Sequence, residues 1–109
     1  DADDHQRLAD RGASLSHNPG SNLKLGSGIA DFRGLLDHKV NVAIGTDGVA
    51  SSDNLNVFEA MRMAAYLSRV QGHPVERWVS AREAFHAATE GGARALGFDR
   101  IGRIEAGWK

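Results

Sequence analysis

The chain has 109 residues, of which 41% are hydrophobic and 25% are charged, values that are ordinary for a globular protein and that argue against intrinsic disorder. The chain contains 13 Lys and Arg residues and 14 Asp and Glu residues, which gives a net charge of -1. It has no basic block, so a nucleic-acid partner is disfavoured. The absence of Cys excludes disulfides, thiolate metal ligands and Cys nucleophiles.

The chain begins with a predicted helix and a short strand. Residues 3–11 are polar, contain no Gly or Pro and are followed by Gly12, a pattern typical of a short helix with a glycine stop. Residues 13–17 are predicted to form a strand, because the turn signal Asn-Pro-Gly follows directly at 18–20. The first strand therefore ends at residue 17.

A loop and a second helix are predicted next. Residues 21–28 contain Gly26 and Gly28 and are interpreted as a loop. Residues 29–37 have apolar residues three and four positions apart, which places them on one face of a helix. These residues are Ile29, Phe32, Leu35 and Leu36.

The segment 40–47 gives the clearest strand pattern in the chain. Val40, Val42 and Ile44 alternate with smaller residues, and Gly45 interrupts the run. Asp47 is therefore predicted to lie at the C-terminal end of this strand.

A long helix is predicted after a loop of small residues at 48–52. Asp53 is a suitable N-cap, and the helix is expected to run to about Gln71, before Gly72 and Pro74. Its inward stripe should consist of Leu55, Phe58, Met61 and Ala65.

Two more helices and an extended tail complete the prediction. Ser80 and Glu83 have the spacing of a capping box, which predicts a helix that begins at Ser80. Thr89 is expected to cap a further short helix that ends at Gly97, and residues 101–109 read as extended.

The predicted fold class is α/β with a parallel sheet, because the two strands are separated by a helical crossover and not by a hairpin turn. Parallel sheets occur almost only where both faces are buried. Two strands cannot achieve that alone, so we expect the chain to be a piece of a larger α/β unit, with a boundary near residue 98.

Asp47 is the strongest candidate for chemistry, because ligands and catalytic groups in α/β proteins gather at the C-terminal ends of parallel strands. A carboxylate there is suited to bind a divalent metal ion, to take a proton from metal-bound water, or to do both. The alternative is a structural role, in which Asp47 caps the following helix or forms an ion pair within the loop.

The segment His17–Asn22 follows the other strand and is expected at the same end of the sheet. His17, Ser21 and Asn22 are candidates for contact with a substrate or for support of the site. The alternative is a hydrogen-bonded turn in which Asn and Ser bond their own backbone. Direct metal binding by His17 is disfavoured, because no second ligand lies near it at the usual spacing.

Five motifs together resemble the amidohydrolase superfamily, in the branch that contains methylthioadenosine/S-adenosylhomocysteine deaminase, guanine deaminase and chlorohydrolases. They occur in the expected order over nearly the whole chain. Residues 101–109 are similar to the segment with which such proteins leave the barrel and enter a small β-sandwich. The five motifs are His17–Asn22, Leu25–Ile29, Asn41–Gly48, Phe58–Arg62 and Ala88–Gly97.

The resemblance implies the C-terminal portion of a (β/α)8 TIM barrel, in which the two predicted strands are the seventh and eighth. Residues 1–98 would belong to the barrel, and residues 99–109 would start the return into the β-sandwich. One divalent metal ion is implied, zinc or alternatively iron, with Asp47 as the ligand on the eighth strand. The family's histidine ligands belong to earlier strands that this sequence does not contain.

The resemblance also implies an activity for the complete protein, namely hydrolytic deamination of an aminated purine, nucleoside, pterin or triazine. Metal-bound water would give a proton to Asp47, which would pass it to the departing ammonia. Alternatives are a hydrolase that acts on a C-Cl, alkylamine or cyclic amide bond, and a non-catalytic α/β fragment. The 109 residues alone are expected to be inactive.

The expected partner is a small heterocyclic substrate, and a homo-oligomer is compatible with the sequence. No apolar run approaches the roughly 20 residues that cross a bilayer. The N-terminus also lacks the basic start and apolar core of a signal peptide. We therefore expect no membrane partner and a cytoplasmic location.

Overall fold

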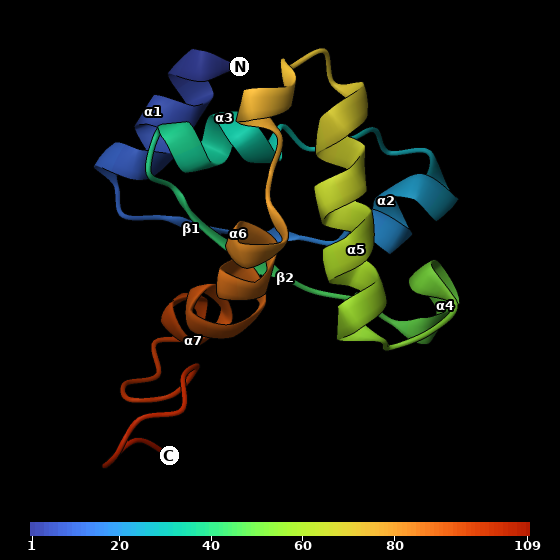
Figure 1. Cartoon of the computed structure of the whole chain (residues 1–109). Helices are drawn as coiled ribbons and strands as arrows, with labels where there is room; N and C mark the ends of the chain where they lie inside the picture. The colour runs from blue at the N-terminus through green and yellow to red at the C-terminus, as the bar shows by residue number, and fades with distance from the viewer.

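Two short parallel strands lie at the centre of the computed structural model, which describes residues 1–109 (Figure 1). Strand β1 (Ser14–His17) pairs with strand β2 (Asn41–Ile44) in a register that matches Ser14 with Asn41 and His17 with Ile44. The two strands pair only with each other. This confirms the prediction of an α/β chain with a parallel sheet.

Helices and single turns make up most of the remaining structure. The α-helices are α1 (Ala2–Asp10), α2 (Pro19–Leu25), α3 (Phe32–Asp37), α4 (Val49–Ser52), α5 (Val57–Leu67), α6 (Ala81–His86) and α7 (Gly92–Ala95). Two 3₁₀ turns, η1 (Ser68–Val70) and η2 (Val75–Arg77), connect α5 to α6, and a π-helical turn, η3 (Ala87–Gly91), connects α6 to α7. No helix has both the length and the apolar character needed to cross a membrane.

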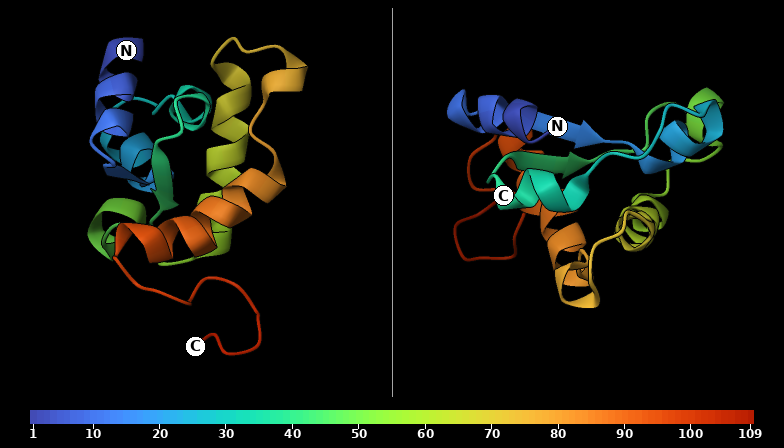
Figure 2. Two further views of the ribbon diagram at one scale, coloured as in Figure 1. Left: turned by 90° about the vertical axis from the view of Figure 1, so that its left-hand side faces the viewer. Right: turned by 90° about the horizontal axis from the view of Figure 1, so that it is seen from above.

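The hydrophobic core lies between β2 and three helices, α3, α5 and α6. Val42 and Ile44 of β2 pack in one cluster with Phe32 and Leu35 of α3. Figure 2 shows the strands from two further directions, with the helices gathered around them. The remaining members of the cluster are Val40, Ala60, Ala64, Ala65, Val79, Ala84 and Ala87.

The start of α6 confirms the predicted capping box. The Ser80 hydroxyl accepts a hydrogen bond from the Glu83 N–H, and the Glu83 carboxylate accepts one from the Ser80 N–H at 2.9 Å. Both of these N–H groups would otherwise lack a partner at the helix N-terminus.

Two predicted loops are wrong, because each contains a helix. Residues 21–28 were expected as a loop, but α2 covers Pro19–Leu25, with Pro19 in its first turn and Gly26 as a left-handed C-cap at φ 66°. Pro is favoured at the first position of a helix and Gly just after its end. Here these two helix signals are stronger than the Gly and Ser content that had suggested a loop. The expected loop at 48–52 likewise contains the single helical turn α4.

The predicted start of the long helix is wrong, and its predicted inward stripe is only half right. Of the four stripe residues, Ala65 is buried and Met61 packs against the core, as predicted. Asp53 is the left-handed C-cap of α4 at φ 68°, and the side chain of Asn56 accepts hydrogen bonds from the N–H groups of Phe58 and Glu59 at the start of α5. Leu55 and Phe58 are 62% and 76% exposed, whereas the buried residues of α5 are Ala60, Ala64 and Ala65. Small side chains let this helix approach the sheet closely.

The C-terminal region differs from its prediction in two places. Thr89 lies inside the π-helical turn η3, where its hydroxyl donates to the Phe85 carbonyl at 2.8 Å, and it caps no helix. Residues 101–109 form turns and no strand, and the Lys109 N–H donates to the Arg100 carbonyl at 2.9 Å. The tail is therefore a folded loop and not an extended segment.

The two adjacent glycines in η3 and α7 should respond oppositely to substitution. A Cβ on Gly91 would overlap the backbone carbonyl oxygen of Val42, while a Cβ on Gly92 would meet nothing within 4 Å. We predict that Gly91→Ala lowers the free energy of unfolding by about 1–3 kcal/mol through overpacking. Gly92→Ala should instead raise it by about 0.4–1 kcal/mol. Chemical denaturation of both variants checks this, and equal effects would contradict the close approach at Gly91.

Candidate functional site

Asp47 lies just beyond the C-terminal end of β2, as predicted. Its backbone is in the left-handed region, with φ 57°, a conformation that Asp and Asn adopt more readily than most non-glycine residues. One carboxylate oxygen, Oδ1, accepts a hydrogen bond from the N–H of Gly48 at 2.8 Å. The turn after β2 therefore presents Asp47 in a defined orientation.

Ser21 connects this carboxylate to the end of the other strand. The Ser21 hydroxyl donates to Oδ2 of Asp47 at 2.8 Å, across 26 residues of sequence. Ser21 belongs to the first turn of α2 and is 4% exposed, whereas the Asp47 side chain is exposed. The structure thus brings together two of the predicted site residues.

The hydrogen bonds to Asp47 favour its ionised form. The hydroxyl of Ser21, followed by that of the nearby Ser51 and by the Gly48 N–H, holds the pKa of the Asp47 carboxyl below its usual value. Ser21 and Gly48 are the two direct donors, since the Ser51 hydroxyl donates to the Gly48 carbonyl at 3.1 Å. No ion pair of the chain involves Asp47. At neutral pH the residue is an anionic, exposed oxygen donor that no cation of this chain neutralises.

His17 and Asn22 make no hydrogen bond to Asp47. The His17 ring is 2% exposed and packs edge-to-face on Phe32, with the ring centroids 5.6 Å apart. Both of its ring nitrogens lack a hydrogen-bond partner. Asn22 is half-buried in α2, and its backbone carbonyl accepts from the Ser27 N–H at 2.9 Å. A substrate role for these residues stays a prediction.

The other four histidines lie away from Asp47. His5 and His38 form an edge-to-face pair with their ring centroids 5.4 Å apart. Nε2 of His73 lies 3.4 Å from Oδ1 of Asp31, and Nδ1 of His86 lies 3.3 Å from Oε1 of Glu90. No three His, Asp or Glu residues of the chain form a group that could hold a metal ion. Asp47 fits a divalent cation as one ligand, and this chain does not complete a three-ligand site around it.

A contact between Asn18 and Gly45 was not anticipated from the sequence. Each residue follows the last residue of its strand, and a Cβ on Gly45 would overlap the amide oxygen Oδ1 of Asn18. The Asn18 amide also donates to the Ser16 carbonyl at 3.3 Å. The only sequence signal was the strand break at Gly45, which did not point to Asn18.

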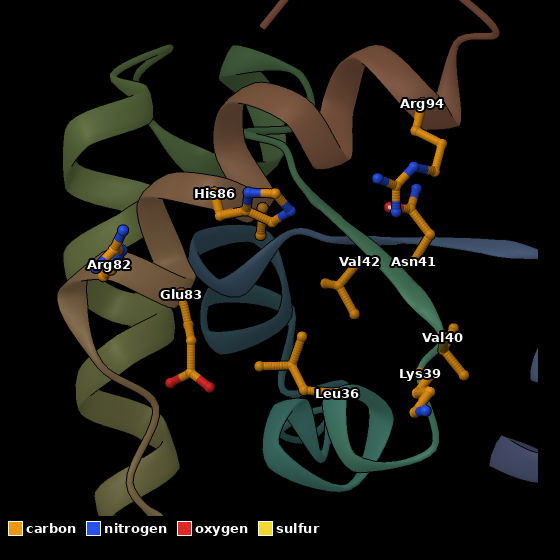
Figure 3. A pocket seen from close by; sticks show the side chains of 10 residues that line it. Leu36, Lys39, Val40, Asn41, Val42, Arg82, Glu83, His86 and Arg94 are labelled. Atoms are coloured by element: carbon orange, nitrogen blue, oxygen red, sulfur yellow. Dashed lines mark hydrogen bonds between the residues drawn. The ribbon is translucent and has the colours of Figure 1, made fainter. Parts of the chain in front are cut away.

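A cavity of about 420 Å³ lies at the other end of β2 (Figure 3). Its apolar lining includes Leu36 and Val42, and Glu83 is the one carboxylate among the residues that surround it. None of the predicted site residues lines it. The cavity is therefore separate from the strand ends that carry Asp47.

Residues 2–109 match the profile of the Amidohydrolase family. Among the relatives, a 5-methylthioadenosine/S-adenosylhomocysteine deaminase from Halobacterium salinarum is 50% identical over 100 residues, which cover 92% of this chain and 23% of that protein. The chain spans about a quarter of the length of the relatives it matches.

Solved structures give the same result at the level of the fold. An adenosine deaminase from Xanthomonas campestris with bound zinc superposes with a TM-score of 0.91 and 45% identity, over 96% of this chain and 24% of that chain. Atrazine chlorohydrolase from Arthrobacter aurescens, complexed with zinc, also gives 0.91, with 34% identity over 98% of this chain and 24% of that chain.

The buried ring of His17 should make the fold sensitive to mild acid. Burial lowers the pKa of His17 to about 4 from the usual 6.5, so the unfolded chain binds the proton first as the pH falls. The contribution of neutral His17 to the free energy of unfolding is complete above the unfolded-state pKa of 6.5. It is lost as the pH falls from this value to the folded-state pKa of about 4, at about 1.4 kcal/mol per pH unit. From about pH 7 to about pH 5 the loss should be about 2 kcal/mol.

Denaturant titrations at both pH values, on the chain and on its His17→Leu variant, measure this loss. The variant has no ionisable group at this position, so its stability should change less over the same interval. An equal change in both proteins would show that His17 does not carry the effect.

Proposed function

The chain belongs to the amidohydrolase family, and we propose that it is part of a metal-dependent enzyme that hydrolytically deaminates an aminated heterocycle. Substrates of the purine, nucleoside, pterin or triazine type fit this proposal. The observation that carries it is the position of Asp47, an ionised carboxylate at the C-terminal end of a parallel strand, held by Ser21 and Gly48. This is the end of the strand at which α/β barrels place their catalytic groups.

Within the complete enzyme, we propose that β1 and β2 are the seventh and eighth strands of a (β/α)8 barrel. Two features support this arrangement. The two strands pair only with each other, so each has a free edge for a further strand. Several large apolar side chains are exposed and are available to pack on further segments, among them Phe58, Val70 and Leu96. Residues 99–109 would then begin the return to a second, smaller domain.

The proposed metal ion is divalent, with zinc favoured because two similar structures contain it and iron as the alternative. When bound, such an ion supplies a nucleophile at neutral pH by acidifying a water molecule. Asp47 would be one of its ligands. The remaining ligands would come from the part of the enzyme outside these 109 residues.

Asp47 has the capacity to bind a metal ion and carry a proton at the same time. A carboxylate has about four lone-pair sites, and the hydrogen bonds from Ser21 and Gly48 use one on each oxygen. Each oxygen therefore keeps a free site. Asp47 would accept a proton on one oxygen and release it to the departing amino group.

The segment from His17 to Asn22 would line the substrate side of the site, as the sequence suggested. Among the three predicted residues of this segment, Asn22 is the one that is only half-buried, so we propose it for direct contact with the substrate. His17 and Ser21 are buried, and in this proposal they support the segment by packing beneath its surface and do not contact the substrate.

A second candidate activity is displacement of chloride, because the chain is also similar to atrazine chlorohydrolase. The same activated water serves both reactions. Deamination is favoured, since the deaminase from Halobacterium salinarum is 50% identical and the chlorohydrolase 34% identical. Screening the complete enzyme for ammonia and chloride release from a panel of heterocycles separates the two.

Removal of the Asp47 charge should abolish turnover and leave the fold intact. In the complete enzyme, we predict that Asp47→Asn lowers kcat by at least about 100-fold, because general acid–base catalysis contributes that much or more. Asp53→Asn is the matched control, since Asp53 is exposed, lies six residues further on and should give wild-type turnover. Wild-type activity in Asp47→Asn would refute the proposal.

The 109-residue chain by itself should bind zinc only weakly. One carboxylate is a poor site for an ion that usually takes three or four protein ligands, so we predict a dissociation constant weaker than about micromolar. Equilibrium dialysis against buffered zinc measures it. Tighter binding by the isolated chain would mean that the site is not shared with other segments.

A further inference from the structure

Two residues of the segment after β1 lie against the turn that carries Asp47, namely Asn18 beside Gly45 and Ser21 at the carboxylate. We propose that both are positioning residues, which act on the reaction by fixing Asp47 and not by touching the substrate. Ser21 fixes the carboxylate, and Asn18 fixes the start of the turn at Gly45. This inference rests on the proposed role of Asp47.

Ser21 is placed to orient the carboxylate and little else. It is 4% exposed, so its hydroxyl is shielded from ligands in solution, and Asp47 Oδ2 is its hydrogen-bond acceptor at 2.8 Å. The other oxygen, Oδ1, accepts from the N–H of Gly48. A donor on each oxygen fixes the plane of the carboxylate and leaves its charge in place.

Asn18 occupies the N-cap position of α2 but makes no capping hydrogen bond, although Asn is among the best N-cap residues. Its amide instead bonds to the Ser16 carbonyl, and its Oδ1 lies against Gly45 so closely that a Cβ there would overlap it. The backbone of Gly45 is outside the left-handed region. At Gly45 space matters more than backbone angles, because an added Cβ would have to displace the end of the Asn18 side chain.

Gly45 is also held from the side of β1. Its N–H donates to the carbonyl of His17 at 3.0 Å, which continues the strand pairing one residue beyond β2. The main chain of β1 and the side chain of Asn18, the residue that follows β1, therefore both lie against Gly45, two residues before Asp47. A displacement of about 1 Å in a catalytic group is enough to slow a reaction roughly 100-fold.

The first test separates positioning from substrate contact at Ser21, in the complete enzyme. Loss of a group that orients a metal ligand typically weakens metal affinity or activity by about 10–100-fold. We expect Ser21→Ala to lower kcat and zinc affinity by factors in this range, with KM changed by less than about 3-fold. Ser21→Thr, which keeps the hydroxyl, should recover most of both.

Ser27→Ala is the matched control, because Ser27 is exposed and follows α2. It should leave kcat, KM and zinc affinity at wild-type values. A Ser21→Ala enzyme with raised KM and unchanged kcat would overturn the positioning role, since it would indicate direct substrate contact. Wild-type kcat and zinc affinity in Ser21→Ala would overturn it as well.

The second test uses the contact between Asn18 and Gly45. Gly45→Ala should displace the Asn18 amide and lower kcat by about 10-fold or more, because neighbouring residues couple when they share space. The same substitution in an Asn18→Ala background should have a clearly smaller effect, since the overlapping oxygen is gone and only the looser approach to the Ser16 hydroxyl, at 3.1 Å, is left. Equal fold-changes in the two backgrounds would show that Asn18 does not act through Gly45.

The two proposals fail differently. If Asp47→Asn keeps its activity, the proposed function is wrong. If Asp47→Asn is inactive while the Ser21 and Asn18 variants keep wild-type kcat and zinc affinity, only the positioning role is wrong. Thermal unfolding of each variant identifies a global loss of structure, and zinc affinity provides a readout that does not depend on turnover.

Discussion

The parallel pairing of β1 with β2 is the constraint on which the rest of this structure depends. Because the strands run in the same direction and His17 is level with Ile44, the residues that follow each strand emerge at the same edge of the sheet. The hydrogen bond between Ser21 and Asp47, across 26 residues, is a direct result. An antiparallel or shifted pairing would place these two side chains at opposite ends of the strands or on opposite faces of the sheet.

The core explains why these strand ends stay in register. Val42 and Ile44 pack against α3, α5 and α6, and the buried face of α5 consists of alanines that allow a close approach. The π-helical turn η3, which continues α6, also comes close to β2, where Gly91 lies against the carbonyl of Val42. The large apolar residues of the core lie mainly on β2 and α3, and small residues lie on the helices that come near the backbone of β2. Three of the four residues of β2 are buried, so the turn that carries Asp47 starts from a strand that is packed in the core.

Local sequence signals were sufficient where a few neighbouring residues decide the outcome. The alternation from Val40 to Ile44 and the break at Gly45 located Asp47, and the pair Ser80 and Glu83 located the start of α6. Local sequence signals failed where two neighbouring residues could both cap a helix, or where a contact depends on the distance between two chain segments. Asp53 and Asn56 are both suitable N-cap residues for α5. Asn56 takes this position because Asp53 has a left-handed backbone and ends α4. The contact of Asn18 with Gly45 depends on the gap between two chain segments, which no periodicity encodes.

The neutrality of the groups around Asp47 has a chemical reason. A Lys or Arg in the place of Ser21 would hold the carboxylate more strongly, since hydrogen bonds between charged groups are roughly twice as strong as neutral ones. It would also neutralise the charge that attracts a metal ion and would compete for the same lone pairs. A hydroxyl and a backbone N–H orient the carboxylate, lower its pKa and leave its charge available. Several other acidic side chains near helix ends are paired with Arg, Lys or His, as Asp37, Asp53 and Glu90 are, which suits a structural role. Asp47 differs from these three because both groups that donate hydrogen bonds to it are uncharged, so its charge stays available to a ligand.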